Sequence, residues 1–275
     1  MVAESALFGN TLGNAIRLGL LCLTLVALQA AGSFDAHAQP KFDSDHVGPP
    51  GSGRDGELFM AYQGGPFPAV VVLHGCEGMG KHYRDWGKLL RTWGYAVLLV
   101  DSFGPRGQGN ICNRGNLVSS QERLKDAYRA ADYLRTLPNI RHDRIGVIGF
   151  SHGGGAVLNL VTQPAVPSGS TPFSAAVAFY PPCDRPTAAL LTDTLILIGA
   201  ADNWTPARDC QRWQQALPPG GRTIQLKIYP DAHHAFDTIP EVHDYLGHTI
   251  GHNEGATAQA EADTRAFLAQ RLMAR

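Results

Sequence analysis

Short apolar runs alternate with longer amphipathic segments over most of the chain. Runs rich in β-branched and aromatic residues predict strands at residues 69–73, 95–100, 144–150, 175–180, 195–198 and 223–229. Apolar positions that recur every three or four residues predict helices at residues 81–93, 120–137, 153–162, 206–216 and 257–272. A further short segment, residues 57–61, predicts an antiparallel edge strand.

This alternation indicates an α/β fold with a mostly parallel central sheet and helices on both faces. The run Ala69–Leu73 is apolar throughout, which is typical of a strand buried on both faces. We find no internal repeat and no second linker, so we expect one domain over residues 54–275. In such sheets, functional residues gather at the carboxyl ends of the strands.

The beginning of the chain carries a different pattern, which predicts export. A mostly apolar stretch, residues 16–31, is followed by Ala36-His37-Ala38, as in a secretory signal peptide that is cleaved after Ala38. The stretch is shorter than the roughly 20 residues that a permanent transmembrane helix needs. We predict a signal peptide at 1–38, a flexible linker at 39–53, and a periplasmic or extracellular protein without stable membrane insertion after cleavage; a retained anchor is the alternative.

Composition and charge narrow the function classes. The 275 residues are 44% hydrophobic and 17% charged, as in a globular protein, and the formal net charge is −1. No basic excess is present to neutralise phosphates, so we expect no nucleic-acid partner.

Four cysteines lie beyond the predicted signal peptide, and an even number in an exported protein predicts two disulfides. We favour the pairs Cys76–Cys112 and Cys183–Cys210, because each pair follows the ends of strands that should be neighbours. Buried free thiols are the alternative.

The segment Gly149-Phe150-Ser151-His152-Gly153 matches the pattern G-x-S-x-G between a predicted strand and a predicted helix. This context is typical of the nucleophile elbow, a sharp turn that projects a serine hydroxyl above the sheet. Serine needs a base to accept its proton and an acid to hold that base, so the pattern predicts that Ser151 is a nucleophile with two partners elsewhere.

The acid and the base should follow later strands, in that order. Asp202 lies just past the predicted strand 195–198, and this position favours it as the acid. The competing acids are Asp184, Asp193, Asp209 and Asp231. The base should follow strand 223–229, where His233 and His234 are adjacent, and spacing alone leaves the choice between them open.

A serine hydrolase also needs backbone N–H groups aimed at the developing negative charge. One should come from His152, directly after the nucleophile. The other should come from Cys76, in the loop after strand 69–73.

Two other patterns suggest cofactors, but neither is complete. Residues 75–81 approach the phosphate-binding pattern G-x-x-x-x-G-K, yet His82 stands where Ser or Thr must hold Mg²⁺. His248 and His252 have metal-ligand spacing, but glycines around them argue against a helix, and we interpret them and His243 as solvated loop histidines. We therefore expect no metal and no organic cofactor.

Several segments together resemble the dienelactone hydrolase family of α/β-hydrolases. They are Leu73-His74-Gly75-Cys76-Glu77-Gly78, the stretch Asp101 to Gly107, the elbow, Tyr180-Pro181-Pro182-Cys183, and Ala232-His233-His234-Ala235-Phe236. The resemblance spans about residues 55–272 and implies the α/β-hydrolase fold. It also implies that the base is His234, the acid is Asp202, and the oxyanion amides are those of Cys76 and His152. Founding members of the family use a cysteine nucleophile where this chain has Ser151, which favours a general serine esterase.

We therefore predict a secreted serine hydrolase that cleaves carboxylic esters or lactones and acts on a small-molecule substrate. The sequence does not determine the oligomeric state. A peptidase-like amide hydrolase and a non-catalytic exported binding protein are the alternatives. Four residues are candidates for substrate contact: Arg106, Phe103, Trp204 and Tyr180. Arg106 could instead tie down its own loop, and the aromatic side chains could instead belong to the core.

Overall fold

The computed structural model describes residues 56–62, 64–162, 166–184, 187–238 and 241–274. The predicted signal peptide and linker lie outside these residues. Among the described helices, none combines the length and the apolar character that crossing a membrane requires.

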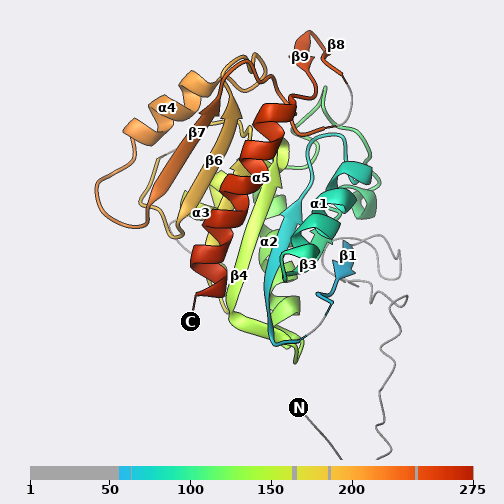
Figure 1. The fold of residues 1–275 in the computed structure, drawn as a ribbon, viewed down its shortest axis with the longest axis vertical. Coiled ribbons are helices and arrows are strands. Elements are labelled where there is room, and N and C mark those ends of the chain that lie inside the picture. The colour runs from blue at the N-terminus through green and yellow to red at the C-terminus, as the bar shows by residue number, and fades with distance from the viewer. Residues whose placement is uncertain (1–55, 63, 163–165, 185–186, 239–240, 275) are drawn as a thin grey trace, which may run out of the picture. The chain divides into compact units, whose positions relative to one another are not determined.

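A seven-stranded sheet forms the centre of the described structure, with strand order β1-β3-β2-β4-β5-β6-β7 (Figure 1). The strands are β1 Gly56–Phe59, β2 Phe67–Leu73, β3 Ala96–Val100, β4 Ile140–Phe150, β5 Ala175–Phe179, β6 Thr194–Gly199 and β7 Ile224–Tyr229. β1 pairs antiparallel with β3, and every other pairing is parallel. The predicted mostly parallel sheet and its antiparallel edge strand are confirmed.

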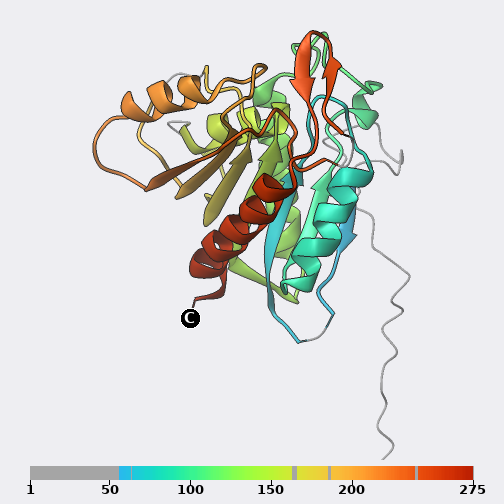
Figure 2. The same ribbon diagram turned by 45° about the horizontal axis from the view of Figure 1, so that its top comes forward.

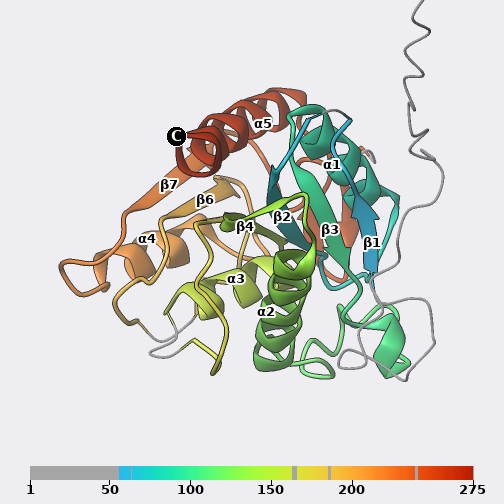
Figure 3. The same cartoon turned by 90° about the horizontal axis from the view of Figure 1, so that it is seen from below.

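Helices cover both faces of this sheet. They are α1 Lys81–Thr92, α2 Ser120–Thr136, α3 His152–Thr162, α4 Ala207–Gln215 and α5 Glu254–Leu268, which continues into a π-helical turn, Ala269–Met273. Figure 3 shows α1 and α5 on one face and α2, α3 and α4 on the other. Strands β2, β3, β5 and β6 are buried at every position, which explains their continuous apolar runs.

Side-chain caps set where the clearest helices begin. The Ser119 hydroxyl accepts a hydrogen bond from the Glu122 N–H (3.2 Å), and the Glu122 carboxylate accepts one from the Ser119 N–H (2.8 Å). This capping box starts α2 at Ser120. The Asn253 side chain likewise accepts from the Ala256 N–H (2.9 Å), so α5 begins at Glu254, earlier than the predicted residue 257.

One element was not predicted. β8 His243–Tyr245 and β9 His248–Ile250 form a hairpin, where we expected solvated loop histidines. The turn Leu246-Gly247 has positive φ at both residues (52° and 82°), as two-residue hairpins require. The expectation is wrong for His248, whose ring stacks on that of Trp204 with centroids 4.7 Å apart. Figure 2 shows the hairpin beyond the carboxyl ends of the sheet strands.

Candidate active site

Ser151 occupies a strained turn between β4 and α3. Its φ is 49°, and its N–H donates to the Phe179 carbonyl (2.9 Å). A Cβ atom on Gly149 would overlap the carbonyl oxygen of Gly153, and one on Gly153 would overlap that of Leu73. Glycine is therefore required on both sides of the serine, because strand and helix backbones approach too closely for any side chain.

A continuous hydrogen-bond chain links Ser151, His234 and Asp202. The Ser151 Oγ lies 2.9 Å from His234 Nε2, and His234 Nδ1 lies 2.8 Å from Asp202 Oδ2. The carboxylate can only accept a hydrogen bond, so the His234 proton is on Nδ1 and Nε2 is free to accept from the serine hydroxyl. These side chains follow β4, β6 and β7, whose carboxyl ends meet at one edge of the sheet. The structure therefore brings the three predicted residues together.

Asp202 sits in a dense set of donors. Its Oδ1 accepts from the N–H groups of Trp204 (2.9 Å) and Thr205 (2.8 Å), and its Oδ2 accepts from the Thr205 hydroxyl (2.9 Å). Burial raises the pKa of Asp202, but the hydrogen bonds and charge of His234 and the Thr205 bonds outweigh it, so the pKa is lowered overall. The carboxylate is thus kept ionised and fixed in position. Thr205 was not among the residues predicted from the sequence, although the spacing D-x-x-T after a strand is a recognisable turn signal.

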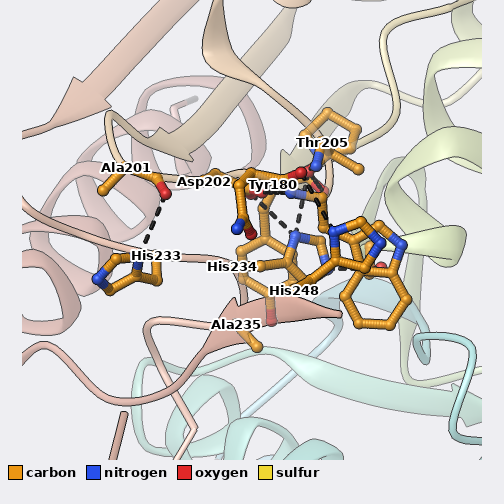
Figure 4. Close-up of polar contacts among 12 residues, drawn as sticks. Tyr180, Ala201, Asp202, Thr205, His233, His234, Ala235 and His248 are labelled. Carbon is orange, nitrogen blue, oxygen red and sulfur yellow. Dashed lines mark hydrogen bonds and ion pairs between the residues drawn. The ribbon is translucent and has the colours of Figure 1, made fainter. Parts of the chain in front are cut away.

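The adjacent histidines point in different directions. His233 Nδ1 lies 3.1 Å from the Ala201 carbonyl, and Figure 4 shows this ring turned away from the cluster of Asp202, Thr205 and His234. The backbone holds His234 in place, because its carbonyl accepts from the Gly251 N–H (3.1 Å), just beyond the hairpin. Only His234 of the two reaches Ser151.

The loop after β2 lies directly beside the serine. A Cβ atom placed on Gly75 would be 3.6 Å from the Ser151 Cβ. The Gly75 N–H donates to the Tyr83 hydroxyl (2.8 Å), and the Cys76 carbonyl accepts from the Ile111 N–H (2.8 Å). The two predicted oxyanion residues, Cys76 and His152, thus come from the segments that flank Ser151.

Two disulfides hold the segments around this edge of the sheet. Cys76 is bonded to Cys112, which ties the loop after β2 to the loop that follows β3. Cys183 is bonded to Cys210, which ties the segment after β5 to α4. These are the pairs that the positions of the strand ends favoured.

Arg106 is engaged within the protein. Its guanidinium donates two hydrogen bonds to the Asp126 carboxylate (2.9 Å and 3.0 Å) and one to the Ser102 carbonyl (2.6 Å). The structure therefore supports the alternative interpretation, in which Arg106 ties down its own loop.

Of the three aromatic candidates, one remains at the surface of the site. Phe103 and Tyr180 are only 1% and 2% exposed, so both belong to the core and neither offers surface to a substrate. The Tyr180 hydroxyl donates to Asp237 instead (2.8 Å). Trp204 is half-buried, and its ring lies 5.0 Å from that of His234. Trp204 therefore lies beside His234, and its contact with a substrate stays a prediction.

A second buried carboxylate, that of Asp237, bonds to residues that pack around the site. Asp237 accepts from Trp86 Nε1 (2.8 Å) and lies 3.2 Å from His82 Nε2, in addition to its bond from Tyr180. Burial lowers the pKa of His82, but the Asp237 carboxylate outweighs it and raises the pKa overall. The Tyr180 ring in turn packs edge-on against His234, with centroids 4.7 Å apart. None of the sequence patterns predicted this cluster around Asp237.

A mostly parallel sheet that carries Ser, Asp and His, in that chain order, after successive strands has the α/β-hydrolase fold. Residues 56–272 match the dienelactone hydrolase family, which covers nearly all of the described structure. The chain therefore belongs to the dienelactone hydrolase family, as its motifs suggested.

Individual relatives are distant. A probable 2-oxo-3-(5-oxofuran-2-ylidene)propanoate lactonase of Bradyrhizobium is 25% identical over 67% of this chain and 81% of its own length. Among solved structures, a putative dienelactone hydrolase from Klebsiella pneumoniae aligns with a TM-score of 0.65 at 22% identity, covering 78% of this chain and 92% of that one. A thermophilic esterase from Thermogutta terrifontis aligns with a TM-score of 0.58 at 16% identity over 78% and 88% of the two chains.

Proposed function

We propose that this protein is a serine hydrolase that cleaves carboxylic esters or lactones through an acyl-enzyme on Ser151. The Ser151 Oγ attacks the substrate carbonyl carbon while His234 Nε2 accepts the hydroxyl proton. The C–O bond to the leaving group then breaks, and His234 returns that proton to the leaving oxygen. Water repeats the sequence on the acyl group, giving the free acid and regenerating Ser151.

The observation that carries the proposal is the chain Ser151–His234–Asp202, with links of 2.9 Å and 2.8 Å. A general base must lie within hydrogen-bond reach of the proton that it takes, and His234 does so without any rearrangement. The lowered pKa of Asp202 keeps a negative charge where the imidazolium forms. The relative named as a lactonase and the neighbour named as an esterase support the substrate class.

Two measurements test this function. The variant Ser151→Ala should lose about three or more orders of magnitude in kcat on a p-nitrophenyl ester while remaining folded. A fluorophosphonate probe should label the wild-type protein at Ser151. The variant Ser168→Ala, which changes an exposed serine, is the matched control and should keep full activity. Unchanged ester turnover in Ser151→Ala would rule out the proposed nucleophile.

We also propose that the protein works outside the cytoplasm. The two disulfides support this location, because such bonds persist in oxidising compartments. N-terminal sequencing of the exported protein should begin at Gln39, and a mature chain that still begins at Met1 would contradict cleavage after Ala38.

A further inference from the structure

A buried guanidinium lies between the two segments that carry the predicted oxyanion amides. Arg123, on α2, has no exposed surface. Its Nη2 donates to the carbonyl of His74, in the loop after β2 (2.7 Å). Its Nη1 donates to Nδ1 of His152, the first residue of α3 (3.0 Å). One side chain therefore holds both segments.

The contact with His152 fixes the state of that ring. A guanidinium only donates hydrogen bonds, so His152 Nδ1 must be the acceptor and the ring proton must be on Nε2. His152 Nε2 lies 2.9 Å from the Gly115 carbonyl oxygen, which accepts its hydrogen bond. His152 is thus neutral and held from two sides, directly after the nucleophile.

On the other side, Arg123 contributes to a set of bonds that orients two successive peptide groups. The first peptide group is held at the His74 carbonyl by Arg123 and at the Gly75 N–H by Tyr83. In the second, the Gly75 carbonyl accepts from His74 Nδ1 (2.7 Å). The C=O and N–H of a trans peptide point in opposite directions, so the Cys76 N–H points away from the His74 ring.

The cost of burying this arginine argues for a role beyond packing. Removing a cation from water is costly, and a protein with a well-packed apolar side chain of the same size in its place is often equally stable or more stable. Burial lowers the pKa of Arg123 to about 10, against the attraction of Asp126. The side chain therefore remains charged at neutral pH, between the segments that carry the two predicted oxyanion amides.

We propose that Arg123 is a positioning residue that holds the Cys76 and His152 amides in register for the oxyanion and adds a buried positive charge behind them. This inference rests on the proposed serine hydrolase function. An oxyanion exists only in the transition state and the tetrahedral intermediate, so Arg123 should act on kcat and leave ground-state binding unchanged.

The test compares Arg123→Met and Arg123→Lys with a control on the same helix, Lys125→Gln, whose side chain is exposed. Arg123→Met should lower kcat on a p-nitrophenyl ester by about 10²- to 10³-fold, the effect of losing one oxyanion donor, with KM changed by less than about 3-fold. The inhibition constant of a trifluoromethyl ketone, whose adduct carries the same oxyanion, should rise by a similar factor. The kcat of Arg123→Lys should lie between those of the wild-type protein and Arg123→Met. A lysine ammonium keeps the charge but lacks the rigid fork that binds the His74 carbonyl and His152 Nδ1 together. Lys125→Gln should match the wild-type protein.

Unchanged kcat in folded Arg123→Met, or a loss of kcat with no change in ketone inhibition, would overturn the inference. If Arg123→Met does not fold, His152→Leu and His152→Asn replace it. The asparagine retains an acceptor for Arg123 and the leucine does not, so the asparagine variant should keep the higher kcat, and equal rates would overturn the inference. Wild-type protein without fluorophosphonate labelling would contradict the proposed function itself. Labelled wild-type protein with unaffected Arg123 variants would contradict only the inference.

Discussion

Removing each disulfide separately should have similar effects on stability but different effects on activity. The bonded cysteines are separated by 36 residues in Cys76–Cys112 and by 27 in Cys183–Cys210. In the chain-entropy treatment, closing loops of these lengths stabilises the folded state by about 3.8 and about 3.6 kcal/mol. Replacing both cysteines of either pair by alanine should therefore lower the free energy of unfolding by nearly the same amount.

Activity should distinguish the pairs, because only Cys76 contributes a predicted oxyanion amide. Without its bond to Cys112, the loop after β2 keeps the Ile111 hydrogen bond but loses its covalent tie. We expect kcat of the Cys76→Ala/Cys112→Ala variant to fall by about 10- to 100-fold, since small displacements of an oxyanion donor are costly. Neither cysteine of the second pair carries a predicted oxyanion amide, so removal of this pair should change kcat by less than about 3-fold.

The assay combines thermal unfolding without reductant and steady-state kinetics on a p-nitrophenyl ester. A loss of nearly 4 kcal/mol corresponds to a Tm decrease of about 8–16 °C for a domain of this size. Both double variants should show this decrease. Equal kcat losses in the two variants would refute the special role of the Cys76 loop, and stability losses below about 1 kcal/mol would refute the loop-entropy reasoning.

Two further predictions concern single residues. Asp202→Asn should lower kcat by about 10⁴-fold, because an amide no longer selects the His234 tautomer with its proton on Nδ1; steady-state kinetics check this, and a loss below about 10-fold would contradict it. Burial and the charge of Arg123 lower the pKa of His74, so the folded protein binds fewer protons here than the unfolded protein. The contribution of neutral His74 to the free energy of unfolding is therefore fully present above about pH 6.5. At lower pH it falls by up to about 1.4 kcal/mol per pH unit. Urea unfolding at pH 6.5 and 5.5 should show a shallower pH dependence in His74→Gln, and an unchanged slope would contradict this account.

The sequence was sufficient to predict the sheet and to single out the candidate residues that the structure brings together, because both follow from local patterns. Strands such as β3 and β6 are buried at every position, and burial on both faces leaves a continuous apolar run that is visible without a structure. Ser151 and Asp202 could be located because Ser151 directly follows the apolar last residues of β4 and Asp202 lies just past β6. Spacing alone did not distinguish His233 from His234. Adjacent side chains point in different directions, and the local backbone decides which of the two faces Ser151.

The supporting residues were not predictable, because their partners are distant in the chain. Arg123 lies between Glu122 and Lys125 on a helix, and this pattern usually indicates a solvated face. Its burial depends on the carbonyl of His74, which is 49 residues away. Asp237 likewise bonds to Trp86 across 151 residues. Neither contact leaves a periodic signal in the sequence.

Three buried charged groups in the described part of the chain lie near one edge of the sheet, and their placement has a physical reason. Asp202, Asp237 and Arg123 each make hydrogen bonds that offset part of their desolvation. Asp202 bonds to the predicted base His234, and Asp237 bonds to Tyr180, which packs against that base. Arg123 bonds to the two segments that carry the predicted oxyanion amides. An apolar core would stabilise the same backbone at lower cost but could not fix the direction of an N–H or the tautomer of an imidazole. The structure therefore places costly buried charges where bond direction matters for the proposed reaction, whereas strands such as β5 contribute only apolar side chains.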